Sequence, residues 1–137
     1  MGSTNFLTLW PTWAPYFKSI LRIVAASMFM MAGTMKLFGF PAPMPHGAAI
    51  AFPSQIWFAA ILETFGGGLL LLGLCTRPIA FLLSGEMAVA YFQVHFQQGP
   101  WPVLNMGQTA VLYCFIWLFF SAAGAGPWSL DAMRGKG

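Results

Sequence analysis

Two glutamates lie inside apolar stretches of the sequence, where a charged group is costly. Glu63 stands in the run AAILETFGGGLLLLGL (59–74), and Glu86 stands in the run IAFLLSGEMAVAYF (79–92). A carboxyl group in such surroundings can exchange a proton or hydrogen-bond the polar head group of a quinone-like ligand. It can equally link two helices as a protonated hydrogen-bond donor. The two residues alone leave both interpretations open.

Two weaker candidates for contacting a cofactor follow Glu86 along the chain. Gln93 comes seven residues after Glu86, so both lie on one face of a helix, and His95 ends the apolar segment 77–95. The chain has one other histidine, His46. Because a zinc ion or a haem needs further ligands at matching positions, we predict no metal site.

The composition places these residues in a membrane protein. Of the 137 residues, 58% are hydrophobic and 7% are charged, and the mean hydropathy is +0.72. A water-soluble domain is typically about a quarter charged, so we expect an integral membrane protein. The net charge of +3 comes without any basic run, and nucleic-acid binding is therefore not expected.

Four apolar segments have the length that a bilayer requires, about 20 residues in a helix. They cover residues 17–38, 54–74, 77–95 and 106–123, and proline and glycine separate them. None alternates with a period of two, as a strand of a membrane barrel would. The sequence predicts an all-α membrane protein with one domain, 1–137, a bundle of four transmembrane helices and a short cytoplasmic tail, 124–137.

The distribution of Lys and Arg predicts the orientation. The side that holds both termini and the loop between the second and third segments carries most of the basic residues: Lys18, Arg22, Arg77, Arg134 and Lys136. The cytoplasmic side of a membrane protein holds such an excess, so we expect both termini in the cytoplasm and the chain in the inner membrane. Arg22 and Lys36 are each expected to extend to the nearest interface, which leaves no basic group at the depth of the glutamates.

Small and polar residues predict how the helices pack and begin. Three glycines share the helix face of Glu63 and permit close approach of another backbone: Gly66, Gly67 and Gly73. Asn105 and Gln108 have the spacing of a capping box before the fourth helix. Thr76 is expected to cap the third helix.

Five strings resemble the DoxX family of small four-helix membrane proteins, and their order and spacing agree with it from residue 22 to residue 131. They are AGTMKLFG (32–39), ETFGG (63–67), GLCTRP (73–78), GEMAVAY (85–91) and NMGQTAVLYC (105–114), followed by the ending GPWSLD (126–131). The resemblance implies the four-helix fold. It also implies a place among proteins of which some are small subunits of quinone-linked membrane oxidoreductases, including thiosulfate:quinone oxidoreductase, and others associate with redox-stress enzymes.

Two positions depart from the family's pattern. Relatives commonly have His where this chain has Ala32, and Glu where it has Gln108. Neither Ala nor an amide can act as a general base, so a site needing those two groups would be impaired. The pattern is retained at Thr34, Lys36, Glu63, Glu86 and Asn105.

Two functions follow as hypotheses. In the first, the chain is a non-catalytic accessory subunit that packs within a larger redox or energy-transducing membrane complex. In the second, it is a small subunit of a quinone-linked oxidoreductase, in which Glu63, Glu86 and Lys36 frame a proton or quinone site. We expect no intrinsic cofactor, with quinone or lipid as the candidates for a bound molecule. The expected partners are membrane lipids and other membrane subunits or further copies of the chain.

Overall fold

The structure is a computed structural model that describes residues 6–44 and 50–136, so His46 lies outside the described residues. All the regular secondary structure of the described part is helical, and it contains no strand. Three helical stretches are long and apolar enough to cross a membrane, and a fourth, Gln108–Ala123, is apolar but shorter; the three are Thr8–Phe38, Gln55–Leu72 and Thr76–Gln98. The all-helical membrane fold predicted from hydropathy is confirmed at this level.

The helices differ from the expected segments at their ends and in their regularity. The first helix is α1 (Phe6–Phe38), and the last two helices are α5 (Gln108–Ala123) and α6 (Leu130–Met133). The second segment is divided into α2 (Gln55–Ile61), the π-helix η2 (Leu62–Gly66) and α3 (Gly67–Leu72). The third consists of α4 (Thr76–Ala90), the π-helix η3 (Tyr91–His95) and the short 3-10 helix η4 (Phe96–Gln98). α1 begins well before residue 17 and contains Pro11 and Pro15, each of which removes one backbone hydrogen bond.

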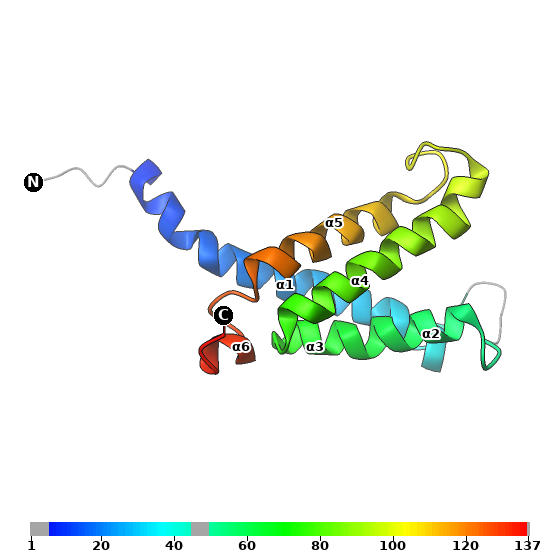
Figure 1. Cartoon of the computed structure of the whole chain (residues 1–137), viewed down its shortest axis with the longest axis horizontal. Coiled ribbons are helices and arrows are strands. Elements are labelled where there is room, and N and C mark those ends of the chain that lie inside the picture. Colours follow the sequence, from blue (N-terminus) through cyan, green and yellow to red (C-terminus); the bar gives the residue numbers. More distant parts are fainter. Residues whose placement is uncertain (1–5, 45–49, 137) are drawn as a thin grey trace, which may run out of the picture.

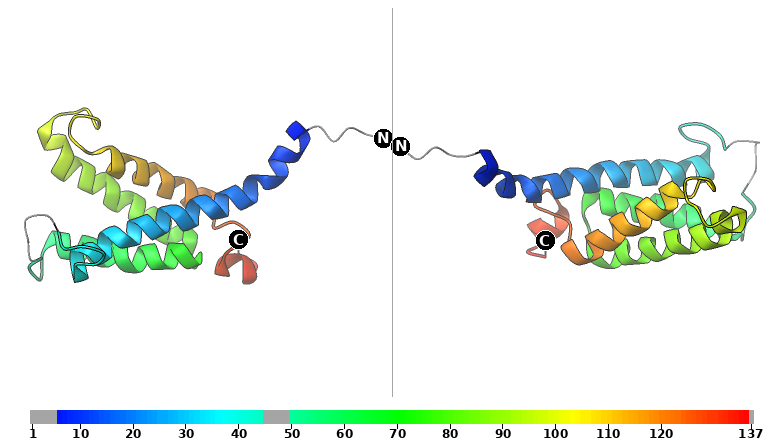
Figure 2. Two further views of the ribbon diagram at one scale, coloured as in Figure 1. Left: turned by 180° about the vertical axis from the view of Figure 1, so that it is seen from behind. Right: turned by 90° about the horizontal axis from the view of Figure 1, so that it is seen from above.

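The helices form two antiparallel hairpins (Figure 1). α1 packs along α2, η2 and α3, while α4 packs along α5, and the hairpins meet mainly through α3, η2 and α4. Toward the loop between α4 and α5 the second hairpin diverges from the first, and the first turns of α1 project beyond the bundle (Figure 2). The two hairpins are therefore held together over part of their length only.

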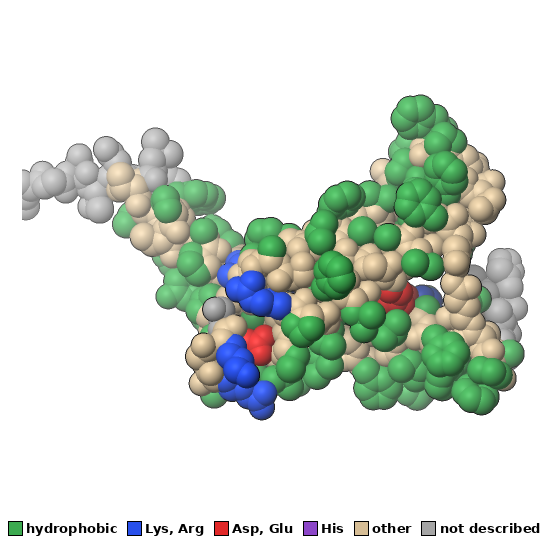
Figure 3. All heavy atoms as spheres, viewed as in Figure 1, with side chains coloured by type: hydrophobic (Ala, Val, Ile, Leu, Met, Phe, Trp, Pro, Cys, Tyr) green, Lys and Arg blue, Asp and Glu red, His purple; other side chains and the backbone are tan. Residues whose placement is uncertain are grey.

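A small apolar core joins the hairpins. It contains small residues where helices approach closely and aromatic residues elsewhere, and its buried members are Ala25, Ala26, Phe29, Leu70, Ala80, Leu83, Met87, Trp117 and Phe120. The Phe29 and Trp117 rings meet edge to face, with centroids 5.3 Å apart. Many large hydrophobic side chains are exposed on the outside as well, as expected where a helix faces lipid, and Figure 3 shows them along the helices on one face.

Arg22 lies inside the protein and does not extend to the interface, so that expectation was wrong. Its side chain is fully buried and donates to four backbone carbonyls: those of Ala125 (2.9 Å), Leu70 (2.5 Å), Leu71 (2.7 Å) and Trp128. The last carbonyls of a helix have no partner within the helix. The guanidinium satisfies that of Leu71 and adds a second bond to that of Leu70, which also accepts from the Gly73 N–H. Arg22 thereby attaches the segment after α5 to the bundle.

Asp131, in α6, caps α4 from far along the chain. Its carboxylate accepts hydrogen bonds from the backbone N–H groups of Cys75 (2.9 Å) and Thr76 (2.8 Å). The prediction that Thr76 caps the third helix is therefore wrong. Cys75 is the N-cap residue of α4, and the Cys75 side chain makes no capping hydrogen bond. Burial alone would raise the pKa of Asp131, but the Thr76 and Cys75 hydrogen bonds and the nearby charge of Arg134 together lower that pKa from its ordinary value. The residues after Ala123 thus form part of the fold and are more than a tail.

Candidate functional site

Glu63 of η2 and Lys36 of α1 form an ion pair between the two helical arms of the first hairpin. The Lys36 ammonium donates to both carboxylate oxygens of Glu63, at 2.5 and 2.6 Å. The Glu63 side chain is 5% exposed and that of Lys36 is 23% exposed. The expectation that no basic group would reach the depth of the glutamates was therefore wrong. An opposite charge at contact distance lowers the cost of keeping a carboxylate away from water.

A close helix contact places the two partners opposite each other. Gly33 of α1 lies against η2, where an added Cβ would come within 2.5 Å of Thr64 Oγ1 and 2.6 Å of the Thr64 backbone nitrogen. Lys36 is one turn beyond Gly33, and Glu63 precedes Thr64. The π-helical turn of η2 widens the helix at this point, and such turns occur frequently at functional sites.

Glu86 completes the cluster from α4 but has no hydrogen-bond partner. Both of its carboxyl oxygens are buried, and neither bonds to any atom of the described residues. The charges of Glu63 and Lys36 nevertheless act on the Glu86 carboxyl, so the three groups lie within electrostatic range. Figure 3 shows acidic and basic atoms together in the space between the diverging hairpins. We call Lys36, Glu63 and Glu86 the Lys–Glu–Glu cluster; no hydrogen bond joins its two glutamates.

The two weaker candidates occupy other positions. The Gln93 side chain accepts a hydrogen bond from Gln55 Nε2, which links the hairpins beyond the cluster. His95 Nδ1 lies 3.0 Å from the carbonyl oxygen of Asn105, so this imidazole is engaged with the loop before α5. Both residues belong to η3, the second π-helical turn. Neither makes a hydrogen bond to the Lys–Glu–Glu cluster within the part of the chain that the structure describes.

The glycines on the Glu63 face lie at close helix contacts. A Cβ on Gly67 would be 3.1 Å from the Met30 backbone, and one on Gly66 would be 3.0 Å from the Leu83 side chain. Gly73 ends α3 with φ of 67°, a left-handed conformation that favours glycine.

Asn105 and Gln108 do not form the expected capping box. Gly107 is the N-cap of α5 and has no side chain to accept a bond, while Gln108 is already the first helical residue. Asn105 instead organises the preceding loop, because Nδ2 donates to the Gly99 carbonyl at 2.7 Å and Oδ1 accepts from the Gly107 N–H at 2.9 Å. Met106 adopts φ of 58°, and this left-handed residue shifts the helix start by two positions.

Sequence reasoning missed Arg22 as an internal residue. The signal was present, because Arg22 is preceded by Ile20 and Leu21 and followed by Ile23 and Val24, well inside the first apolar segment. Ionisable residues within a membrane segment generally face protein and pair with other groups. Lys36 also lies within that segment, although near its end, between Met35 and Leu37.

Three long apolar helices, a fourth shorter one and an internal ionisable cluster define a multi-pass helical membrane protein. The chain belongs to the DoxX family, whose sequence profile matches residues 17–96, and the resemblance noted in the sequence is confirmed. It is 43% identical over 120 residues to an uncharacterized protein of Haemophilus influenzae, covering 85% of this chain and 90% of that one. It is also 28% identical over 120 residues to the inner membrane protein YqjF of Escherichia coli, covering 85% of this chain and 91% of the relative. No solved structure matches the chain significantly.

Proposed function

We propose that the chain is a small subunit of a quinone-linked membrane oxidoreductase and that its Lys–Glu–Glu cluster holds a quinone head group and exchanges a proton with it. The observation that carries this proposal is Glu86, whose two buried carboxyl oxygens have no partner among the described residues while an ion pair lies beside them. A buried polar group without a partner is costly, so a ligand that supplies the missing hydrogen bond would bind there favourably.

Each member of the cluster then has a separate role. Lys36 and Glu63 neutralise each other, and a charged Glu86 would lie beside Glu63 without a counter-ion of its own. We therefore expect Glu86 to carry a proton and to donate it to a quinone carbonyl oxygen. The electrons must come from a redox centre on a partner subunit, because Lys and Glu side chains carry none.

Replacing Glu86 by Gln tests this role. The amide keeps the size of the side chain but cannot exchange a proton, and loss of a general acid typically lowers a rate by about 100-fold or more. We expect quinone reduction by the assembly purified with the chain in mild detergent to fall by that factor, with assembly and thermal midpoint retained. Val89→Ala, which shortens an exposed side chain on the same helix, serves as the control and should leave the rate unchanged.

The alternative function is a non-catalytic accessory subunit in a redox or energy-transducing complex. The extensive apolar surface favours it, because other membrane subunits or further copies of the chain could cover that surface as lipid does. In that case Glu86→Gln would leave turnover unchanged in an intact assembly. If neither a quinone nor a redox subunit is purified with the chain, the quinone-linked proposal is wrong.

We also propose that both termini lie in the cytoplasm and that the chain resides in the inner membrane. Five of the six Lys and Arg residues lie on the side of the termini, and a relative is described as an inner membrane protein. A reporter enzyme that is active only in the periplasm should be inactive when fused to the C-terminus of the full chain. Periplasmic activity of that fusion would reverse the orientation.

A further inference from the structure

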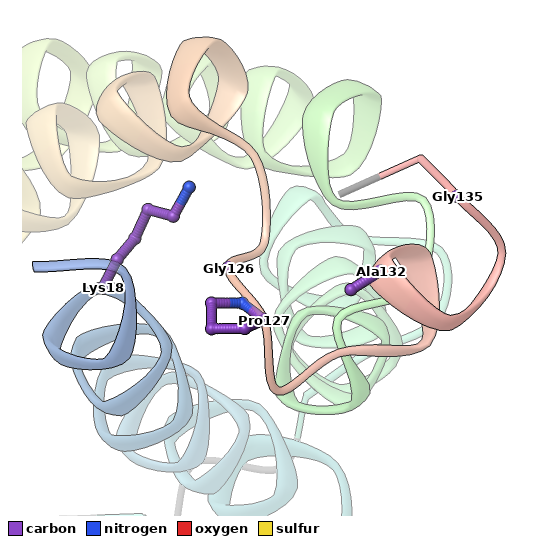
Figure 4. A pocket seen from close by; sticks show the side chains of 5 residues that line it. All are labelled: Lys18, Gly126, Pro127, Ala132 and Gly135. Carbon is purple, nitrogen blue, oxygen red and sulfur yellow. The ribbon is translucent and has the colours of Figure 1, made fainter. Parts of the chain in front are cut away.

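An open pocket lies where the segment after α5 meets α1. Its volume is about 410 Å³, and its lining consists of Lys18, Gly126, Pro127, Ala132 and Gly135. Lys18 is the one charged side chain in this lining, and it extends from α1 toward the end of α5 (Figure 4). The ammonium donates to the Ala123 carbonyl at 2.7 Å. Because an ammonium has three hydrogens, two remain for a ligand in the pocket.

The electrostatic surroundings of the pocket favour an anion. We call the region that carries Lys18, Arg22, Arg77, Arg134 and Lys136 the basic end; it holds five of the six Lys and Arg residues of the sequence. One acidic residue, Asp131, belongs to it, and both oxygens of that carboxylate already accept backbone hydrogen bonds. Five positive charges and one negative charge therefore lie among the described residues of the basic end, which leaves an excess of positive charge there.

The apolar surroundings favour an amphiphile over a soluble anion. Trp128, next to the pocket residue Pro127, lies with its ring centroid 5.6 Å from that of Tyr16. An open groove of about 550 Å³ is lined by Leu9, Thr12, Trp13, Tyr16 and Trp128. Exposed tryptophan and tyrosine are typical of the level at which lipid head groups lie.

We propose that this pocket binds the head group of an anionic phospholipid, with its phosphate against the Lys18 ammonium and its acyl chains along the aromatic groove. Basic pockets between transmembrane helices are known to accept such head groups. The proposal does not depend on the quinone-linked function, because it uses none of the residues of the Lys–Glu–Glu cluster.

Lipid retention by the full chain in mild detergent tests the proposal. The chain is mixed with equal amounts of dioleoyl phosphatidylglycerol and dioleoyl phosphatidylcholine, and bound lipid is counted by native mass spectrometry. We expect the wild type to retain phosphatidylglycerol in preference to phosphatidylcholine. Lys18→Gln should lower that retention about tenfold, as expected for a hydrogen bond to a charged group, while Lys18→Arg should preserve it.

Arg77→Gln is a matched control. Arg77 donates to the carbonyl of Ala122, the neighbour of the Lys18 acceptor, so both variants lose one charge and one bond at the end of α5. Arg77 does not line the pocket, and its variant should retain phosphatidylglycerol like the wild type. Equal losses in the two variants would reveal a general charge effect and overturn the proposal. Equal retention of both lipids by the wild type, or displacement by inorganic phosphate, would also overturn it.

Discussion

Arg22→Met should lower the free energy of unfolding by about 4 kcal/mol, because each buried acceptor left without a partner costs about 1–3 kcal/mol. The guanidinium donates to four carbonyls, two at the end of α3 and two in the segment after α5. The Leu70 carbonyl also accepts from the Gly73 N–H, so the replacement removes the donor from three others: the carbonyls of Leu71, Ala125 and Trp128. Methionine fills much of the same volume but donates no hydrogen bond. Unfolding of the purified protein by increasing SDS in a mild detergent would measure the difference.

The effect should also be local to the segment after α5. Without Arg22 this segment loses its bonds at Ala125 and Trp128, so we expect limited proteolysis to cleave residues 124–136 faster than in the wild type. Arg77→Met is the control: this exposed arginine donates to one carbonyl among the described residues, that of Ala122, so its loss should cost under about 1 kcal/mol. Similar unfolding curves for the two variants would contradict an internal role for Arg22.

The apolar segments could be predicted because hydropathy depends on composition over a long window. The helix ends could not, because each depends on a contact that local propensity does not encode. α4 begins one residue earlier than a Thr76 cap would allow, since Asp131 caps it from 55 residues away. Similarly, the left-handed Met106 moves the start of α5 away from the Asn105 cap.

The members of the candidate site were predicted, but their pairing was not. Glu63 and Glu86 were selected because a buried acid is costly wherever it lies in an apolar run. Which side chain pairs with such an acid depends on how each helix is rotated about its axis. The π-helical turn of η2 changes that rotation at Glu63 itself. The long Lys36 side chain can extend to the membrane interface or toward another helix, and we expected the first. The packing of α1 on η2 places Glu63 within reach and so determines the ion pair.

Gly33→Ala should lower the free energy of unfolding by about 3 kcal/mol. The added methyl group would lie 2.5 Å from Thr64 Oγ1, 2.6 Å from the Thr64 nitrogen and 2.9 Å from the Ala60 carbonyl oxygen. Two of these atoms belong to the backbone, so α1 and η2 must separate, and overpacking of this kind costs about 1–3 kcal/mol or more. Unfolding by SDS in mild detergent would again supply the measurement.

Gly85→Ala is the matched control, because a Cβ at this position in α4 meets no atom within 4 Å. Alanine has the higher helix propensity, so this variant should be as stable as the wild type or more stable by up to about 1 kcal/mol. A stability loss at Gly85 equal to that at Gly33 would mean that glycine content, rather than the close contact with Thr64, determines the result.

Gly33 should also control the ion pair, since the contact that it permits holds Lys36 opposite Glu63. In the wild type, Lys36→Met leaves a buried carboxylate without its counter-ion, which costs about 3 kcal/mol. In the Gly33→Ala background the helices are already separated, so the same replacement should cost at least about 1 kcal/mol less. Additive losses in this double-mutant cycle would show that the helix contact and the ion pair are independent. A positive coupling would instead make the close approach of α1 to η2 the feature that assembles the Lys–Glu–Glu cluster.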